Sequence, residues 1–274
     1  MKKITLSQRP SYFKKTRNFI KYSNITLFLS AALVFVCGCG LNTYEDLNAS
    51  KIIIEKSKYD EYLINRPNGI HDLTGYTPKD SSIGIVLVHG FYPPAWPTKG
   101  FEWAEVLKNM TETQYPIWWF RHEWNDCPEQ NSKILDLALD SLKNSIENLE
   151  LLYAIGHSNG GLIVADLAEK WDSDFNISVH SIASGLNHYT DRLKSCEVQG
   201  KDEYVFGENV DYTQWRTSKD VDGIFKNFDY DPQEVKLKNG NFVLLPKEWN
   251  GKRLGHNLSI QIVMEELVKK INLF

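Results

Sequence analysis

The amino-acid sequence predicts an α/β fold with a mostly parallel β-sheet and helices on both of its faces. Two observations lead to this prediction. Between Ile83 and Ile271, short apolar runs alternate with longer amphipathic stretches, as strands alternate with helices. Within Leu151–Ala168, an apolar run meets a helical stretch through a glycine-rich turn that contains a serine. With 274 residues and 42% hydrophobic content, the chain can bury one sizeable core in one domain.

The expected elements follow in order along the chain. Six short, mainly apolar segments are expected to form strands: Ile83–Gly90, Tyr115–Phe120, Leu151–Ile155, Ile177–Ser184, Val210–Ser218 and Asn241–Leu245. Helices are expected where apolar residues recur at helical spacing, at Gly100–Met110, Ser132–Leu149, from residue 159 onward, and at Ser259–Ile271. The segment Lys51–Leu63 is compatible with a first strand or a short helix.

The turn Gly156-His157-Ser158-Asn159-Gly160 has the form G-x-S-x-G and lies between an expected strand and an expected helix. A serine on such a sharp turn has a strained backbone and an exposed hydroxyl, and the flanking glycines leave room for nearby backbone. The N–H of Asn159 and the positive end of the helix point toward an oxyanion. The pattern predicts Ser158 as a nucleophile. The alternative is a glycine-rich turn with an incidental serine.

From about Ser81 onward, the sequence resembles the α/β-hydrolase family, specifically its lipases and esterases. The resemblance depends on three motifs: GHSNGG at 156–161, VLVHGF at 86–91, and Gly255-His256 ahead of the last expected helix. Together they are specific for the fold and unspecific for the substrate. The resemblance implies an α/β-hydrolase fold. In that family, the region matching Tyr189–Asn209 often carries a lid, which should be small here because the segment is short.

The resemblance also implies roles for one residue before Ser158 in the chain and one residue after it. The His89-Gly90 pair would open a loop whose next residue, Phe91, supplies a second oxyanion-hole N–H from its backbone; alternatively, His89 only caps a strand. His256 lies 98 residues after Ser158, in the loop where the family places its general base. His188 precedes any plausible acid strand, so the chain order Ser, acid, His disfavours it.

The acid that would orient His256 has several candidates. It is expected in the loop that follows the strand Val210–Ser218. Asp222 is preferred because the following Gly-Ile-Phe resembles the D-G-x-V pattern of the family, while Asp220 lies closer to the strand end. Two further aspartates in the same region, Asp229 and Asp231, are less favoured. Any of them could instead be a solvated loop carboxylate.

The first residues of the chain resemble a bacterial lipoprotein signal peptide. Seven Lys and Arg residues precede Ile25–Val36, an apolar stretch of twelve residues that is short for a membrane span of ~20. It ends in Val36-Cys37-Gly38-Cys39, which predicts cleavage after Gly38 and lipidation of Cys39. An ordinary signal peptide or an uncleaved anchor is the alternative. The expected division is signal peptide 1–38, tether 39–50 and hydrolase domain 51–274.

Charge and cysteine content limit the partners and the compartment. Residues 1–38 hold seven of the 31 basic residues and none of the 35 acidic ones. The rest of the chain, with 24 basic and 35 acidic residues, therefore has a net charge of −11. This balance argues against a nucleic-acid partner. Cys127 and Cys196 could form a disulfide in an oxidising compartment or stay as buried thiols. The sequence has no C-x-x-C motif or histidine cluster that would indicate a metal.

These observations predict a serine hydrolase at the cell envelope, attached by a lipid anchor on Cys39. Its Ser-His-Asp triad would cleave carboxylic esters through an acyl-enzyme intermediate, with no cofactor. A thioesterase or an amidase would use the same groups. A different class of protein is also compatible with the sequence, namely a non-catalytic envelope lipoprotein that uses the hydrolase fold as a binding scaffold.

Overall fold

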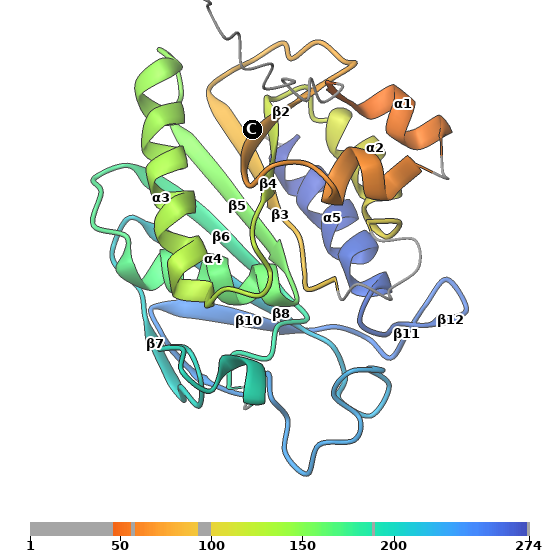
Figure 1. The fold of residues 1–274 in the computed structure, drawn as a ribbon, viewed down its shortest axis with the longest axis vertical. Coiled ribbons are helices and arrows are strands. Elements are labelled where there is room, and N and C mark those ends of the chain that lie inside the picture. The colour runs from red at the N-terminus through yellow and green to blue at the C-terminus, as the bar shows by residue number, and fades with distance from the viewer. Residues whose placement is uncertain (1–45, 56–57, 93–99, 188–189, 273–274) are drawn as a thin grey trace, which may run out of the picture. The chain divides into compact units, whose positions relative to one another are not determined.

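The computed structural model describes residues 46–55, 58–92, 100–187 and 190–272, which are built around an eight-stranded sheet (Figure 1). All six expected strands belong to this sheet: β3 (Ile83–Val88), β4 (Ile117–Arg121), β5 (Leu151–His157), β6 (Asn176–Ile182), β8 (Val210–Arg216) and β10 (Gly240–Leu244). Two strands not foreseen from the sequence, β1 (Leu47–Asn48) and β2 (Gly69–Thr74), complete one edge. The strand order is β1-β2-β4-β3-β5-β6-β8-β10.

The sheet is mostly parallel, as the sequence predicts. Only the pair β2–β4 is antiparallel, with Gly69 opposite Arg121. Strand β5 lies between β3 and β6 at the centre, where Ile155 pairs with Leu87 on one side and His180 on the other. Because β3, β5, β6, β8 and β10 run in the same direction, the loops that follow them leave from one edge of the sheet. Ligands bind at this carboxyl-terminal edge in open α/β sheets.

Helices cover both faces of the sheet, which confirms the expected fold class (Figure 1). Helices α3 (Pro128–Ser145) and α4 (Asn159–Lys170) pack together on one face. Helices α1 (Ala49–Ile54), α2 (Trp103–Thr111) and α5 (Leu258–Ile271) pack on the other. Helix α3 begins four residues earlier than the apolar pattern indicates because Pro128, at its first position, needs no hydrogen-bond acceptor for a backbone N–H.

Two separate apolar clusters lie on the two faces of the sheet. In β3, Ile85 and Leu87 join the cluster under α2 and α5, while Val86 and Val88 join the cluster under α3 and α4. Every residue of β3 is buried, and its side chains alternate between the faces. This explains why the central strands appear in the sequence as continuous apolar runs rather than as alternating ones.

The structure corrects the expected start of the folded domain. Leu47 and Asn48 form strand β1 and pair with Leu73 and Thr74 of β2. The Asn48 side chain then accepts a hydrogen bond from the Lys51 N–H and caps helix α1. Residues 47–50 were expected to belong to a tether, but they are part of the domain, because a buried Leu47 and a helix cap anchor them. The expected signal peptide and Cys39 lie outside the described residues.

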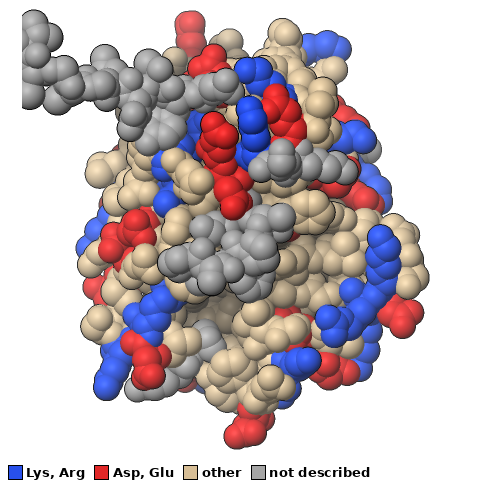
Figure 2. Space-filling view, turned by 45° about the vertical axis from the view of Figure 1, so that its right-hand side comes forward, with Lys and Arg blue, Asp and Glu red and all other residues tan. Residues whose placement is uncertain are grey.

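Two small two-stranded sheets lie outside the main sheet. One joins β7 (Glu203–Val205) to β9 (Lys236–Lys238), and the other is the hairpin of β11 (Glu248–Trp249) and β12 (Lys252–Arg253). Among the helices of the described residues, none is both long and apolar enough to cross a membrane. On the face seen in Figure 2, acidic and basic side chains are interspersed, without a large area of one sign.

Candidate active site

Ser158 occupies a sharp turn between the end of β5 at His157 and the start of α4 at Asn159. Its backbone has φ 56° and ψ −117°, a conformation that non-glycine residues rarely adopt and that costs about 1–3 kcal/mol. The Ser158 N–H donates to the carbonyl of Ile182 at 2.9 Å, which holds the turn against the neighbouring strand. Strand, strained serine and helix therefore follow each other in the order that the motif requires.

The two glycines that flank Ser158 are required by close contacts between backbone segments. A Cβ on Gly156 would lie 2.2 Å from the carbonyl oxygen of Gly160. A Cβ on Gly160 would lie 2.3 Å from the carbonyl oxygen of Val88 in β3. Neither backbone atom can move without breaking the sheet or the helix. The spacing of glycines around the serine thus follows from the packing of α4 onto β3 and β5.

The structure places Asp222 against His256. Asp222 is fully buried, and its Oδ2 lies 3.1 Å from Nδ1 of His256. The same carboxylate accepts hydrogen bonds from the Thr217 hydroxyl at 2.6 Å and from the Ile224 N–H at 2.8 Å. Burial alone would raise the pKa of Asp222, but these donors and His256 outweigh burial and lower that pKa below its usual value. Asp222 is therefore an anion, and Nδ1 of His256 carries the proton of the hydrogen bond.

The alternative acid, Asp220, lies elsewhere. Its side chain is 62% exposed and forms an ion pair with Nζ of Lys247 at 2.6 Å. The hydrogen bond that Lys247 donates in this pair is the largest cause of the lowered pKa of Asp220. Of the preferred Asp222 and the alternative Asp220, the structure brings Asp222 and not Asp220 to His256. His188, which chain order disfavours as the base, is outside the described residues.

His256 is held by its backbone as well as by its ring. Its carbonyl oxygen accepts a hydrogen bond from Nε2 of His157 at 3.0 Å and another from the Ser259 hydroxyl at 2.5 Å. The ring of Phe225 contacts the His256 ring edge-on, with centroids 5.4 Å apart. Burial, followed by the charge of His256, lowers the pKa of His157 to about 3, so His157 stays neutral. No local motif indicates a role for His157, because only the fold brings residue 157 to residue 256.

The loop from His89 to Phe91 lies directly beside Ser158. A Cβ on Gly90 would come 3.2 Å from the Ser158 Cβ, so this position needs a residue without a side chain. His89 is buried, and its ring stacks on His122 with centroids 4.0 Å apart. Its Nε2 accepts the His122 N–H at 3.2 Å, and its Nδ1 donates to the Gly90 carbonyl at 2.7 Å. His89 therefore fixes the loop that leads to Phe91, which is more than the capping of a strand.

Ser158, His256, Phe91 and Asn159 line one cavity of about 420 Å³. Two charged side chains that the sequence did not single out also line it, Glu102 and Arg192. Glu102 is buried and accepts a hydrogen bond from the Tyr92 hydroxyl, and burial raises its pKa. No local sequence signal marks either residue, because both reach the cavity from segments that are distant along the chain.

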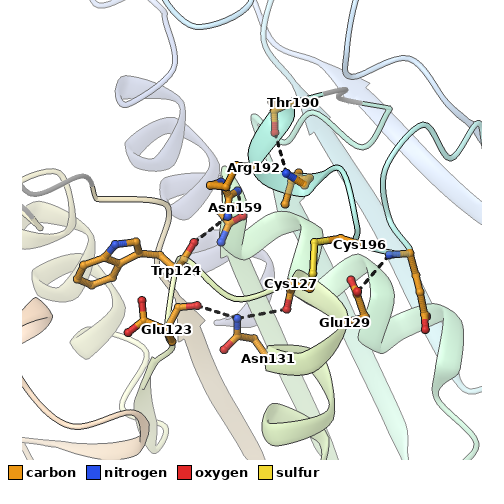
Figure 3. Close-up of a disulfide and its surroundings, with 11 residues drawn as sticks. Glu123, Trp124, Cys127, Glu129, Asn131, Asn159, Thr190, Arg192 and Cys196 are labelled. Atoms are coloured by element: carbon orange, nitrogen blue, oxygen red, sulfur yellow. Dashed lines mark hydrogen bonds between the residues drawn. A yellow bond between two sulfur atoms is a disulfide. The ribbon is translucent and has the colours of Figure 1, made fainter.

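Cys127 and Cys196 form a disulfide, with Cα atoms 5.4 Å apart (Figure 3). The bond connects the residue just before α3 to the segment after β6, across 69 residues of sequence. Glu129 lies next to both sulfur atoms, and these three side chains are the one cluster of possible metal ligands within the described part of the chain. Sulfurs that are bonded to each other are not free thiolates, so this cluster does not fit a metal ion.

The chain is similar to solved structures with which it shares little sequence identity. Est1E from Butyrivibrio proteoclasticus is 13% identical with a TM-score of 0.46, covering 74% of this chain and 92% of its own. An esterase of Pyrococcus furiosus, Pf2001, is 12% identical with a TM-score of 0.45, and the match covers 77% of this chain and 97% of the esterase. XC6422 of Xanthomonas campestris is described as an α/β serine hydrolase without a lid. It is 9% identical with a TM-score of 0.46, and the match covers 74% of this chain and 86% of XC6422. No family model and no curated protein matches the sequence.

These similarities are too distant to indicate an activity or a substrate. The fold class instead follows from the molecule itself. The sheet is mostly parallel, and a strained serine directly follows its central strand β5. A buried aspartate and a histidine come from loops later in the chain, at the same carboxyl-terminal edge of the sheet. This combination of topology and loop order defines an α/β-hydrolase fold.

Proposed function

We propose that the protein is a serine hydrolase that cleaves carboxylic esters. The observation that carries the proposal is that Ser158, in its strained turn, lines the same cavity as His256, whose Nδ1 is bound to the buried Asp222. A neutral imidazole whose Nδ1–H is held by a carboxylate presents an unprotonated Nε2. That nitrogen is the general base that activates a serine hydroxyl.

The proposed reaction proceeds in two steps. His256 takes the proton of Ser158 as its Oγ attacks the ester carbonyl, and the backbone N–H groups of Phe91 and Asn159 stabilise the oxyanion. The N–H of Asn159 is at the first position of α4, where the helix provides no acceptor for it. Proton return from His256 releases the alcohol and leaves an acyl-Ser158 ester. Water then attacks this ester with His256 again as base, which releases the acid.

The experiment that tests this function is labelling with a fluorophosphonate probe, which reacts with a serine activated by a nearby base. We expect the wild type to be labelled and Ser158→Ala to be unlabelled, with wild-type circular dichroism in both. Hydrolysis of 4-nitrophenyl esters should be lost in the same variant by several orders of magnitude. A well-folded wild type that neither reacts with the probe nor hydrolyses any ester would contradict the proposal and favour a binding scaffold.

We also propose that the mature protein is exported and anchored at the cell envelope through a lipid on Cys39. The basic segment, the apolar stretch and the Val36–Cys39 motif support this localisation. The disulfide between Cys127 and Cys196 is typical of an oxidising compartment outside the cytosol. A labelled fatty acid should be incorporated into the wild type and not into Cys39→Ser. Absence of label from both would count against the anchor.

A further inference from the structure

Arg192 places a guanidinium group on the wall of the cavity, next to the proposed oxyanion hole. Its Nη2 donates to Oδ1 of Asn159 at 2.8 Å, and its Nη1 donates to the carbonyl of Trp124 at 2.7 Å (Figure 3). The guanidinium carbon lies 4.8 Å from the centroid of the Phe91 ring. Arg192 thus contacts both residues whose backbone N–H groups are proposed to bind the oxyanion. It lines the same cavity as Ser158 and His256.

The positive charge of Arg192 has no anionic partner within the described residues. None of the ion pairs there includes it. Burial lowers the pKa of Arg192, with no carboxylate opposing it. The buried Arg121 and Arg216 differ, since Glu123 offsets burial for the first, and Glu234 and Asp231 do so for the second. Arg192 is partly buried, so its cation has lost part of its hydration, and an anionic ligand would compensate for that loss.

The segment that carries Arg192 is fixed to the rest of the domain. Arg192 belongs to a short 3₁₀-helix, Asp191–Leu193, whose Leu193 is buried. Four residues further on, Cys196 is bonded to Cys127 at the start of α3 (Figure 3). The N–H of Glu197 also donates to Oε1 of Glu129 at 3.1 Å. The guanidinium is therefore held in place before any ligand arrives, which lowers the entropic cost of binding.

Two of the five guanidinium N–H groups are used in these hydrogen bonds, and the other three have no acceptor among the described residues. A planar guanidinium matches a carboxylate in shape. Arg192 is the one arginine among the described residues that line the cavity, and Glu102 on its wall adds an acidic group, so the site suits a singly charged anion better than a phosphate dianion. The polar Asn159, for which the sequence offers no reason, has a role in this arrangement because its side chain orients Arg192.

Resting on the proposed function, we propose that Arg192 binds a carboxylate on the substrate, so that the protein acts on esters that carry a carboxylate in their acyl or alcohol part. In this role Arg192 is a specificity-determining residue. It binds the substrate away from the reacting bond and takes no part in proton transfer. The competing explanation is that Arg192 only supports Asn159 and Phe91, in which case every ester would depend on it equally.

The test compares matched esters with and without a carboxylate. In the acyl series, 4-nitrophenyl monoesters of adipate, suberate and sebacate are paired with the hexanoate, octanoate and decanoate. In the alcohol series, 4-acetoxybenzoate is paired with 4-methylphenyl acetate. The kcat/KM for each ester is measured with the wild type, Arg192→Gln, Arg192→Lys and Arg253→Gln. Arg253 lies in the exposed hairpin strand β12 and is not among the residues that line the cavity, so this last variant removes the same charge from outside the cavity wall.

We expect the wild type to prefer the carboxylate ester in at least one series. Arg192→Gln should lower its kcat/KM by about 10- to 100-fold and change that of the neutral partner by less than about 3-fold. Arg192→Lys should retain part of the preference, and Arg253→Gln all of it. An equal loss for both members of each pair, or no wild-type preference in either series, would overturn the inference. A preference for a phosphonate-bearing analogue over the carboxylate would overturn the choice of anion.

These outcomes are distinct from failure of the proposed function. If the wild type is labelled by the fluorophosphonate and hydrolyses charged and neutral esters equally, the function stands and the assignment of Arg192 is wrong. If the wild type is not labelled and hydrolyses neither, the proposed function itself is wrong.

Discussion

A hydroxyl, a backbone N–H group and a histidine surround the carboxylate of Asp222, and each comes from a different part of the chain. The Thr217 hydroxyl comes from the end of the strand segment, the Ile224 N–H from the following turn, and His256 from the loop before α5. The side chain of Asp220, two residues earlier, is exposed and pairs with the exposed Lys247. Since both are loop aspartates in the sequence, only the tertiary structure separates a buried anion from a solvated one.

At this scale we predict that Asp222→Asn lowers kcat for a 4-nitrophenyl ester by about 10³- to 10⁴-fold. The amide cannot hold His256 with the proton on Nδ1 as a carboxylate does, so Nε2 is no longer the basic nitrogen. Asp220→Asn is the matched control, and its kcat should stay close to wild type because its ion pair is exposed. Steady-state kinetics of the two purified variants give the answer. Equal losses in both, or a loss confined to Asp220→Asn, would contradict the assignment.

The residues that the sequence identified are those whose motif is local. Ser158 and Asn159 belong to one turn, and the glycines around them are needed for contacts that any such turn makes. Arg192, Glu102 and His157 could not be found in the same way. Each is an ordinary residue of its segment and gains its role from a contact with a residue that is distant along the chain.

At the scale of elements, the buried parallel strands were the most predictable part of the fold. β3 and β5 are covered by helices on both faces, so they appear as continuous apolar runs in the sequence. β2 was missed because most of its side chains are only partly buried, and β1 because it has two residues. The polar segment of 39–50 looked like a tether, yet its last residues are anchored by pairing with β2.

The disulfide joins the start of helix α3 to the segment that carries Arg192, and it closes a loop across 69 residues. We predict that replacing both Cys127 and Cys196 by Ser lowers the free energy of unfolding by about 4 kcal/mol, from the chain entropy that the cross-link removes from the unfolded state. Urea denaturation measures this change.

Dithiothreitol serves as the control for this prediction. It should lower the stability of the wild type toward that of the double variant and leave the double variant unchanged. If reduction and substitution both leave the urea midpoint at its wild-type value, the cross-link does not stabilise the fold.

At the scale of the whole molecule, four buried histidines link folding to pH. His89, His122, His157 and His180 are each almost fully buried, and burial is the largest cause of a lowered pKa in every case. The pKa is about 4 for His122 and about 3 for His157 and His180. In the unfolded chain each would titrate near its ordinary value of ~6.5. Below that pH the unfolded chain therefore binds protons that the folded protein does not.

The sign of the pH effect follows from this difference. Stability that is fully present above about pH 6.5 is lost as the pH falls toward 4, because protonation favours the unfolded chain. Two carboxyl groups, Glu102 and Asp136, oppose this trend, since burial raises their pKa and the folded protein binds their protons first. The lowered pKa of Asp222 adds a further loss only below its ordinary value of 3.8. The interval from pH 6.5 to 5 therefore isolates the histidines best.

We predict that the free energy of unfolding, measured by urea denaturation in steps across this interval, falls with a slope that corresponds to an uptake of about two to four protons near pH 5. His157→Gln offers a matched control, because the glutamine amide retains a donor for the carbonyl of His256 but cannot titrate. Its slope should be smaller by about one proton at the same pH. A stability that does not change between pH 6.5 and 5 would mean that the four histidines are accessible to protons in the folded protein, which would contradict their burial. A slope in His157→Gln equal to that of the wild type would remove His157 from this group and leave the decrease to the other three.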